Sequence, residues 1–141
     1  MSSRAFFPIA IALTCACAAA FAAPETAPHA AACVAALEAQ ETALAETLKG
    51  GEPVQPVLLK VVRSGIAIIG TQYLAGLREA EARQLLKAAQ QEVQTLPPAA
   101  AGERQAQCLK EGEALYEHSS ALERSLITTA AQRRIRRITA A

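Results

Sequence analysis

The first 22 residues constrain the fold of the whole chain, because they have the pattern of a cleavable export signal. Arg4 supplies the positive charge, residues 6–19 form a short apolar segment, and Ala20-Phe21-Ala22 is a small-x-small cleavage site typical of bacteria. The segment is too short and too rich in alanine to be a spanning helix. We therefore expect cleavage near Ala22 and a mature chain of residues 23–141 that folds in the bacterial periplasm or is secreted.

Export leaves two cysteines in the mature chain. Cys15 and Cys17 are removed with the signal, and Cys33 and Cys108 remain. An even number of cysteines in an oxidising compartment indicates a disulfide, with two unpaired buried thiols as the alternative. Closing a loop of that span stabilises by roughly 4.5 kcal/mol on the chain-entropy model, which is an upper figure. A lipid anchor requires a small residue directly before the modified cysteine and a leucine-like residue three positions before it. Thr14 stands directly before Cys15 and three positions before Cys17, so both cysteines fit poorly.

Composition predicts an all-helical protein and excludes several chemistries. Alanine, the best helix former, makes up about a quarter of the chain. The sequence contains no Asp, Asn or Trp, so sites that need an Asp dyad or an Asp-oriented histidine are excluded or must use Glu alone. Removal of Arg4 leaves equal numbers of acidic and basic residues, and a chain without net charge has no global field that attracts nucleic acid.

Apolar periodicity predicts four helices separated by glycine and proline signals. Gly50-Gly51 ends the first helix, Gly76 the second and Pro97-Pro98 the third. The second helix is the most apolar, and we expect it to be buried, with Gly65 and Gly70 allowing a neighbour to approach closely. Short connections favour antiparallel neighbours, so the predicted fold is an all-α, up-down four-helix bundle in one domain. The expected ranges are 30–49, 55–75, 79–96 and a long C-terminal helix that begins between 99 and 103.

The predicted disulfide conflicts with a regular bundle. Cys33 lies near the start of the first helix, and Cys108 lies about two turns into the last one. At 1.5 Å per residue this leaves them ~10 Å apart in height, too far for a disulfide. We expect the bond to form and the bundle to be irregular, with an overhanging hairpin or a steep crossing by the first helix.

The C-terminal helix changes its apolar face along its length. At 100° per residue one face carries the expected core stripe, made of Cys108, Leu115, Leu122 and Leu126. Farther on, the apolar face lies roughly 140° away and comprises Ile127, Ala131, Ile135 and Ile138. Ordinary drift is only about 20° per heptad, so a straight helix cannot bury both faces in one core. We expect a bend near Thr128-Thr129, or final turns that extend past the bundle.

The last ten residues, 132–141, form a basic amphipathic tail. Its four arginines are Arg133, Arg134, Arg136 and Arg137. One interpretation is contact with an anionic surface or an acidic partner. The other is a solvated helix end, in which the cations complement the helix dipole and contribute about 0.3–1 kcal/mol.

Candidate catalytic and metal-binding residues lack the necessary context. His29, Cys33, Cys108 and His118 formally supply a zinc set, but Cys108 and His118 are about 15 Å apart on a helix. A disulfide would also consume both thiolates. The sequence has no Cys-x-x-Cys-His run for haem attachment. We therefore expect no metal, no cofactor and no catalytic residues.

These patterns predict an exported, non-enzymatic helical module that interacts through its surface. The residues with definable roles are the disulfide cysteines and the four arginines of the tail. The partner is expected to be a protein or an anionic envelope surface, with no nucleic acid and no transmembrane helix in the mature chain. The alternative is a carrier of a small apolar ligand, with a pocket between helices around Ile66, Ile69 and Leu85.

Overall fold

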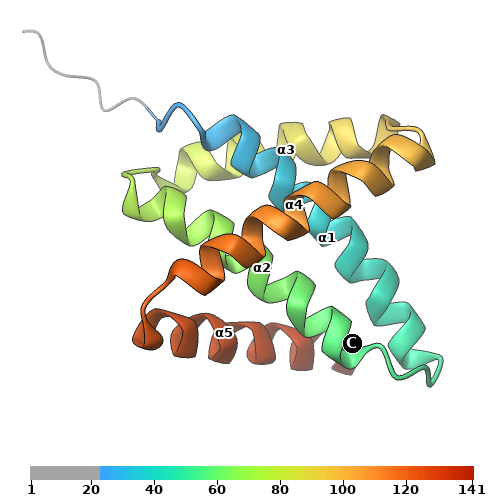
Figure 1. Ribbon diagram of the computed structural model, residues 1–141. Coiled ribbons are helices and arrows are strands. Elements are labelled where there is room, and N and C mark those ends of the chain that lie inside the picture. Colours follow the sequence, from blue (N-terminus) through green and yellow to red (C-terminus); the bar gives the residue numbers. More distant parts are fainter. Residues whose placement is uncertain (1–22) are drawn as a thin grey trace, which may run out of the picture.

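The computed structural model describes residues 23–141, so the predicted export signal and its two cysteines lie outside the described residues. This part of the chain forms five α-helices, which confirms the all-α class and corrects the predicted number of four (Figure 1). Their bounds are α1 Ala27–Lys49, α2 Gln55–Leu74, α3 Glu79–Thr95, α4 Pro98–His118 and α5 Ala121–Ala140.

Glycine ends α1 and α2 as the sequence predicts. Gly51 and Gly76 have φ angles of 93° and 101°, in the left-handed region that other residues rarely adopt. After α2, the amide of Leu77 donates to the carbonyl of Gln72 at 2.9 Å, a six-to-one bond that satisfies a carbonyl at the helix end. The chain then reverses directly into the next helix, which keeps successive helices adjacent.

The helices are layered around α1 and α2. These two form a hairpin, α3 packs against α1, α5 packs against α2, and α4 lies steeply across both central helices (Figure 1). The main core cluster comes from α1, α2 and α4 and includes Cys33, Leu37, Val61, Ile68 and Cys108. The fold is therefore an irregular helical assembly rather than a parallel-sided bundle.

The crossing of α4 resolves the conflict over the disulfide. Cys33 and Cys108 form a disulfide in this structure, with their Cα atoms 5.1 Å apart, and both side chains are buried. Because α4 crosses α1 at a steep angle, residues at different heights in a regular bundle meet at the crossing point. The predicted bond and the predicted irregularity are both confirmed.

The expected close approach occurs at a different glycine. A Cβ added to Gly65 or Gly70 would meet nothing within 4 Å, whereas one added to Gly112 of α4 would lie 2.6 Å from the Cβ of Ser64. The glycine that permits tight packing thus belongs to the crossing helix, and the residue that it contacts lies on α2.

The prediction of one long C-terminal helix is wrong. The chain breaks at Ser119-Ser120, where the Ser120 hydroxyl accepts from the amide of Glu123 and the Glu123 carboxylate accepts from the amide of Ser120. This reciprocal capping box starts a new helix. The expected bend near Thr128-Thr129 is also wrong, because Thr128 lies within α5 and its hydroxyl bonds to Tyr116 of α4 at 3.0 Å.

By length and composition alone, α2 could cross a membrane. The same criteria are met by core helices, and three of its side chains, Leu58, Val61 and Ser64, have no exposed surface. Its contacts with α1, α4 and α5 are those of a central helix.

Candidate functional site: the outward face of α5 and the disulfide junction

The break before α5 turns the expected core stripe to the surface. Leu122 and Leu126 are 70% and 61% exposed, so their predicted burial is wrong. The second apolar face contacts the core instead. Ala131 and Ile135 are buried against a cluster that includes Leu58 of α2. α5 is a separate helix with its own cap, so the directions of its side chains do not continue the pattern of α4. The shift of the apolar face therefore needs no bend within α5.

The four predicted contact arginines separate into two groups. Arg134 points inward, where its Nε donates to both carboxylate oxygens of Glu41 at 2.8 and 3.0 Å. It also donates to Glu38 at 3.4 Å. Glu41 is only 7% exposed, so this ion pair attaches α5 to α1. Arg134 therefore has a structural role.

The other three arginines share the outward face of α5 with the leucines. At 100° per residue, Leu122, Leu126, Arg133, Arg136 and Arg137 fall within about 100° of arc. All five are exposed, and these three arginines form no ion pair with any acidic residue in the part of the chain that the structure describes. We call this group the outward face of α5; it is apolar in its first half and cationic in its second.

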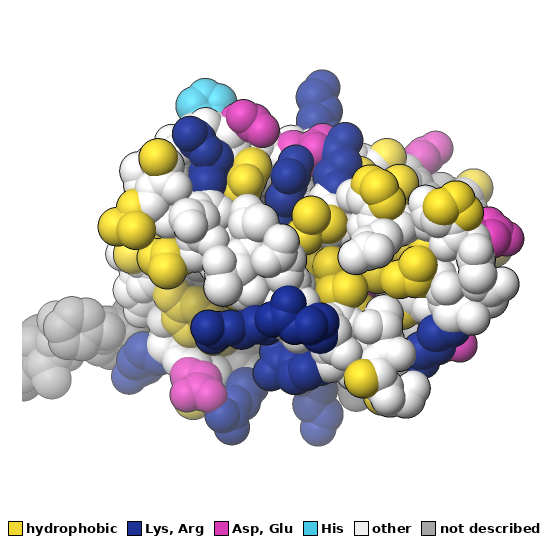
Figure 2. Space-filling model, turned by 90° about the horizontal axis from the view of Figure 1, so that it is seen from below, with side chains coloured by type: hydrophobic (Ala, Val, Ile, Leu, Met, Phe, Trp, Pro, Cys, Tyr) yellow, Lys and Arg dark blue, Asp and Glu magenta, His cyan; other side chains and the backbone are white. Residues whose placement is uncertain are grey.

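An apolar hollow adjoins the first half of this face. It measures about 370 Å³ and lies between α2 and α5, with Ile66, Gly70, Leu74 and Ile127 among its lining residues. Leu74, at the end of α2, is 83% exposed. In the view from below, the side of α5, hydrophobic and basic side chains adjoin across the middle of the face and acidic ones lie toward its edges (Figure 2). The surface joins apolar and cationic side chains, and Glu123 is an acidic residue at the border of the hollow.

The residues expected to line a carrier pocket are spread over three hollows. Ile66 borders the α2–α5 hollow of about 370 Å³, Ile66 and Ile69 line one of about 210 Å³, and Ile69 and Leu85 line another of about 140 Å³. Pockets for drug-sized ligands are typically about 300–1,000 Å³. The ion pair between Glu41 and Arg134 also lines the hollow of about 210 Å³. Neither of these two smaller hollows is lined by all three of the expected residues.

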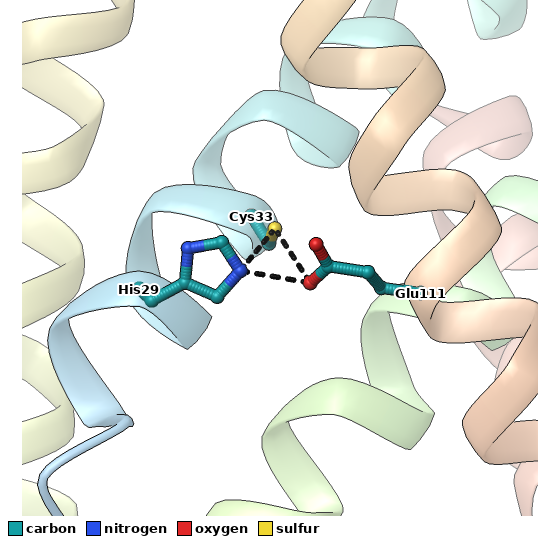
Figure 3. A group of neighbouring side chains, drawn as sticks. All are labelled: His29, Cys33 and Glu111. Carbon is teal, nitrogen blue, oxygen red and sulfur yellow. Dashed lines mark hydrogen bonds and ion pairs between the residues drawn. The ribbon is translucent and has the colours of Figure 1, made fainter.

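Two polar side chains, His29 and Glu111, lie beside Cys33 of the disulfide (Figure 3). His29 lies one turn before Cys33 on α1, and Glu111 lies three residues after Cys108 on α4. His29 Nε2 donates to Glu111 Oε2 at 2.8 Å, and each of these atoms is 3.8 Å from Cys33 Sγ. We call His29, Cys33, Cys108 and Glu111 the disulfide junction. The hydrogen bond from His29 lowers the pKa of Glu111 below its ordinary value, so this carboxylate is ionised.

The junction does not have the geometry of a catalytic triad. In a triad one imidazole nitrogen faces the nucleophile and the other faces the carboxylate. Here both the sulfur and the carboxylate face Nε2 of His29, and Cys33 is held in a disulfide. Several side chains converging on one point resemble a set of ligands more than a proton relay.

Sequence reasoning missed two features for which local signals exist. Glu111 stands at the i+3 position from Cys108, one helical turn away. Ser120 and Glu123 fit the S-x-x-E capping signal that marks a helix start. His118, the other histidine of the formal zinc set, bonds to the carbonyl of Ala114 and is not part of the junction. Comparison of the chain with protein-family models, curated proteins and solved structures found no match.

Proposed function

We propose that this protein is an exported, non-enzymatic accessory module that docks reversibly on an anionic membrane surface through the outward face of α5. The observation that carries the proposal is that Leu122 and Leu126 are exposed on the same face as three arginines without acidic partners in residues 23–141. The pattern of the first 22 residues and the oxidised cysteines support export.

Charge and hydrophobicity on this face favour lipid headgroups over other anionic partners. The whole chain has a formal net charge of only +1, so attraction to nucleic acid would depend on a few arginines. A membrane interface accommodates both halves of the face, because leucines enter the boundary of the acyl chains while arginines remain among the phosphates. The exposed Leu74 at the rim of the α2–α5 hollow extends the apolar half.

The expected affinity is modest. Each arginine near an anionic leaflet contributes about 1 kcal/mol, and full burial of a leucine side chain contributes about 1.5–3 kcal/mol. Only the outer parts of Leu122 and Leu126 are available for insertion, so the total supports reversible docking rather than permanent anchoring. Salt should weaken the binding, because exposed charges are screened over about 8–10 Å at moderate ionic strength.

Flotation with lipid vesicles tests the proposal. The purified exported protein is expected to float with vesicles that contain phosphatidylglycerol and to remain unbound with pure phosphatidylcholine. Replacing Arg133 and Arg137 by Gln should lower the partition coefficient on the order of 10- to 30-fold, because two cationic contacts are lost. The Leu122→Ser and Leu126→Ser double variant should bind weakly as well.

A matched control uses two exposed lysines outside α5. Lys87 of α3 and Lys110 of α4 form no ion pair within residues 23–141, and replacing both by Gln removes the same net charge. This variant should bind like the wild type. Equal loss of binding in both charge variants would mean that net charge, and not the outward face of α5, governs association. Failure of the wild type to bind anionic vesicles would refute the docking function.

Cell fractionation tests export separately. The protein should be recovered from the periplasm or the medium, with an N-terminus at or near Ala23. Recovery of the intact precursor in the cytosol, still beginning at Met1, would refute this part of the proposal.

A further inference from the structure

The disulfide junction brings four ligand-type side chains together from two crossing helices. His29 and Cys33 are four residues apart on α1, and Cys108 and Glu111 are three residues apart on α4. Residues at these spacings lie on one face of a helix. His29 Nε2, Cys33 Sγ and Glu111 Oε2 lie within 4.8 Å of one another, and Cys108 Sγ is bonded directly to Cys33 Sγ.

These separations approach those of a tetrahedral zinc site. Zinc bonds of about 2.0–2.3 Å at tetrahedral angles place neighbouring ligand atoms roughly 3.3–3.8 Å apart. The sulfur of Cys33 is 3.8 Å from both His29 Nε2 and Glu111 Oε2. The 2.8 Å separation between His29 and Glu111 is that of a hydrogen bond and would widen slightly when an ion replaces the proton. The two sulfurs, bonded to each other in the disulfide, must also separate to about 3.8 Å when both bind zinc.

The carboxylate is already oriented for such a role. Gln107 Nε2 donates to Glu111 Oε1 at 3.1 Å, and this bond leaves Oε2 facing His29 and Cys33. A partner that fixes one oxygen while the other faces the site is typical of the shell around metal ligands.

An ion could reach the junction from solvent. A hollow of about 360 Å³ borders His29, Cys33 and Cys108. Arg104 also lines this hollow, but its guanidinium is paired with Glu92 at 2.8 Å. The entrance therefore offers space, and the arginine that lines it is paired with a carboxylate.

In the oxidised protein neither sulfur is a thiolate, so a four-ligand site does not exist. We propose that reduction of the Cys33–Cys108 disulfide converts the junction into a Zn²⁺ site with Cys33, Cys108, His29 and Glu111 as ligands. The reductant is a dithiol, which transfers two electrons and two protons and is itself oxidised to a disulfide. Zn²⁺ then displaces the two thiol protons as the sulfurs bind as thiolates. The metal would replace the covalent link between α1 and α4.

Metal titration of the purified exported protein in two redox states tests this proposal. After anaerobic reduction and removal of the reductant, Co²⁺ should bind at one ion per chain and show thiolate-to-metal charge-transfer absorption in the near ultraviolet. Zn²⁺ should displace it. The oxidised protein should show neither the absorption nor comparable affinity. Equal binding in both redox states, or no stoichiometric binding after reduction, would overturn the proposal.

Two ligand variants with matched controls identify the remaining ligands. His29→Ala and Glu111→Gln should each weaken Zn²⁺ binding by the reduced protein at least 10-fold. His118→Ala and Glu117→Gln change the same residue types at exposed positions of α4 away from the junction and should leave the affinity unchanged. Circular dichroism of the oxidised variants establishes that each one is folded. Unchanged affinity in folded His29 and Glu111 variants would contradict the assigned ligand set.

Discussion

Gly112 of α4 lies so close to Ser64 of α2 that no side chain fits between the two helices. A Cβ at Gly112 would lie 2.6 Å from Ser64 Cβ and 2.7 Å from its carbonyl oxygen. Part of this contact is backbone, so a rotamer change at Ser64 cannot relieve it. The same crossing of α4 brings Cys108 to Cys33, and the close approach and the disulfide therefore depend on one arrangement of helices.

We predict that Gly112→Ala lowers the free energy of unfolding by about 1–3 kcal/mol, because the added methyl group overpacks the crossing. Gly102→Ala, in the same helix with nothing within 4 Å of the added Cβ, should raise it by about 0.5–1 kcal/mol. Urea unfolding of the oxidised proteins measures both effects. A neutral Gly112→Ala variant would contradict the close approach of α4 to α2.

Reduction of the disulfide should lower the free energy of unfolding by about 2–4 kcal/mol in metal-free buffer, the range typical of such bonds. The bond joins positions 75 residues apart, so it constrains most of the unfolded chain. Unfolding with and without reductant measures the difference. The Cys33→Ala and Cys108→Ala double variant is the control, and reductant should leave its stability unchanged.

Substitutions of the adjacent residues Arg134 and Arg133 should differ in their effect on folding stability. Arg134→Gln leaves the nearly buried Glu41 without its charged partner, and we predict a loss of about 1–3 kcal/mol in folding stability. Arg133→Gln removes an exposed side chain and should change stability by less than about 0.5 kcal/mol. Thermal unfolding distinguishes the two variants. Equal stability losses would mean that the contact between Arg134 and Glu41 does not hold α5 against α1.

The hydrogen bond between His29 and Glu111 should contribute to acid sensitivity. The pKa of Glu111 is lower in the folded protein than its ordinary value of 4.5, so the unfolded chain binds this proton more readily. The contribution to stability is therefore complete above pH 4.5 and is lost as the pH falls through the lower folded pKa. Glu111→Gln should flatten the decline in stability over this acidic range. Glu117→Gln is the control, because this exposed carboxylate has no hydrogen-bond or ion-pair partner among residues 23–141, and it should retain the wild-type slope.

Much of the fold could be predicted because local signals and tertiary contacts agree in the first three helices. Glycines at 51 and 76 and the prolines at 97 and 98 act through backbone geometry, which does not depend on neighbours. The disulfide followed from the prediction that residues 1–22 are an export signal, because only two cysteines lie after them.

The wrong predictions concern features that contacts between helices determine and local sequence does not. Periodicity predicts Leu122 in the core only if one helix continues from Cys108. The cap at Ser120 begins a separate helix, in which Leu122 points outward. The pairing of Arg134 with Glu41 joins residues 93 positions apart and leaves no local pattern. The same holds for Glu111 and His29, which meet only because two helices cross. The outward face of α5 was thus recognisable as basic but not as partly apolar.

Fluorescence of a single introduced tryptophan tests the docking of α5 most directly, since the sequence contains no other tryptophan. In Leu122→Trp the emission should shift to shorter wavelength and resist aqueous quenchers when phosphatidylglycerol vesicles are added, and it should not change with phosphatidylcholine vesicles. Gln91→Trp, at an exposed position of α3, should show neither response. A tryptophan at 122 that stays fully accessible to quencher while anionic vesicles are in excess would contradict the account.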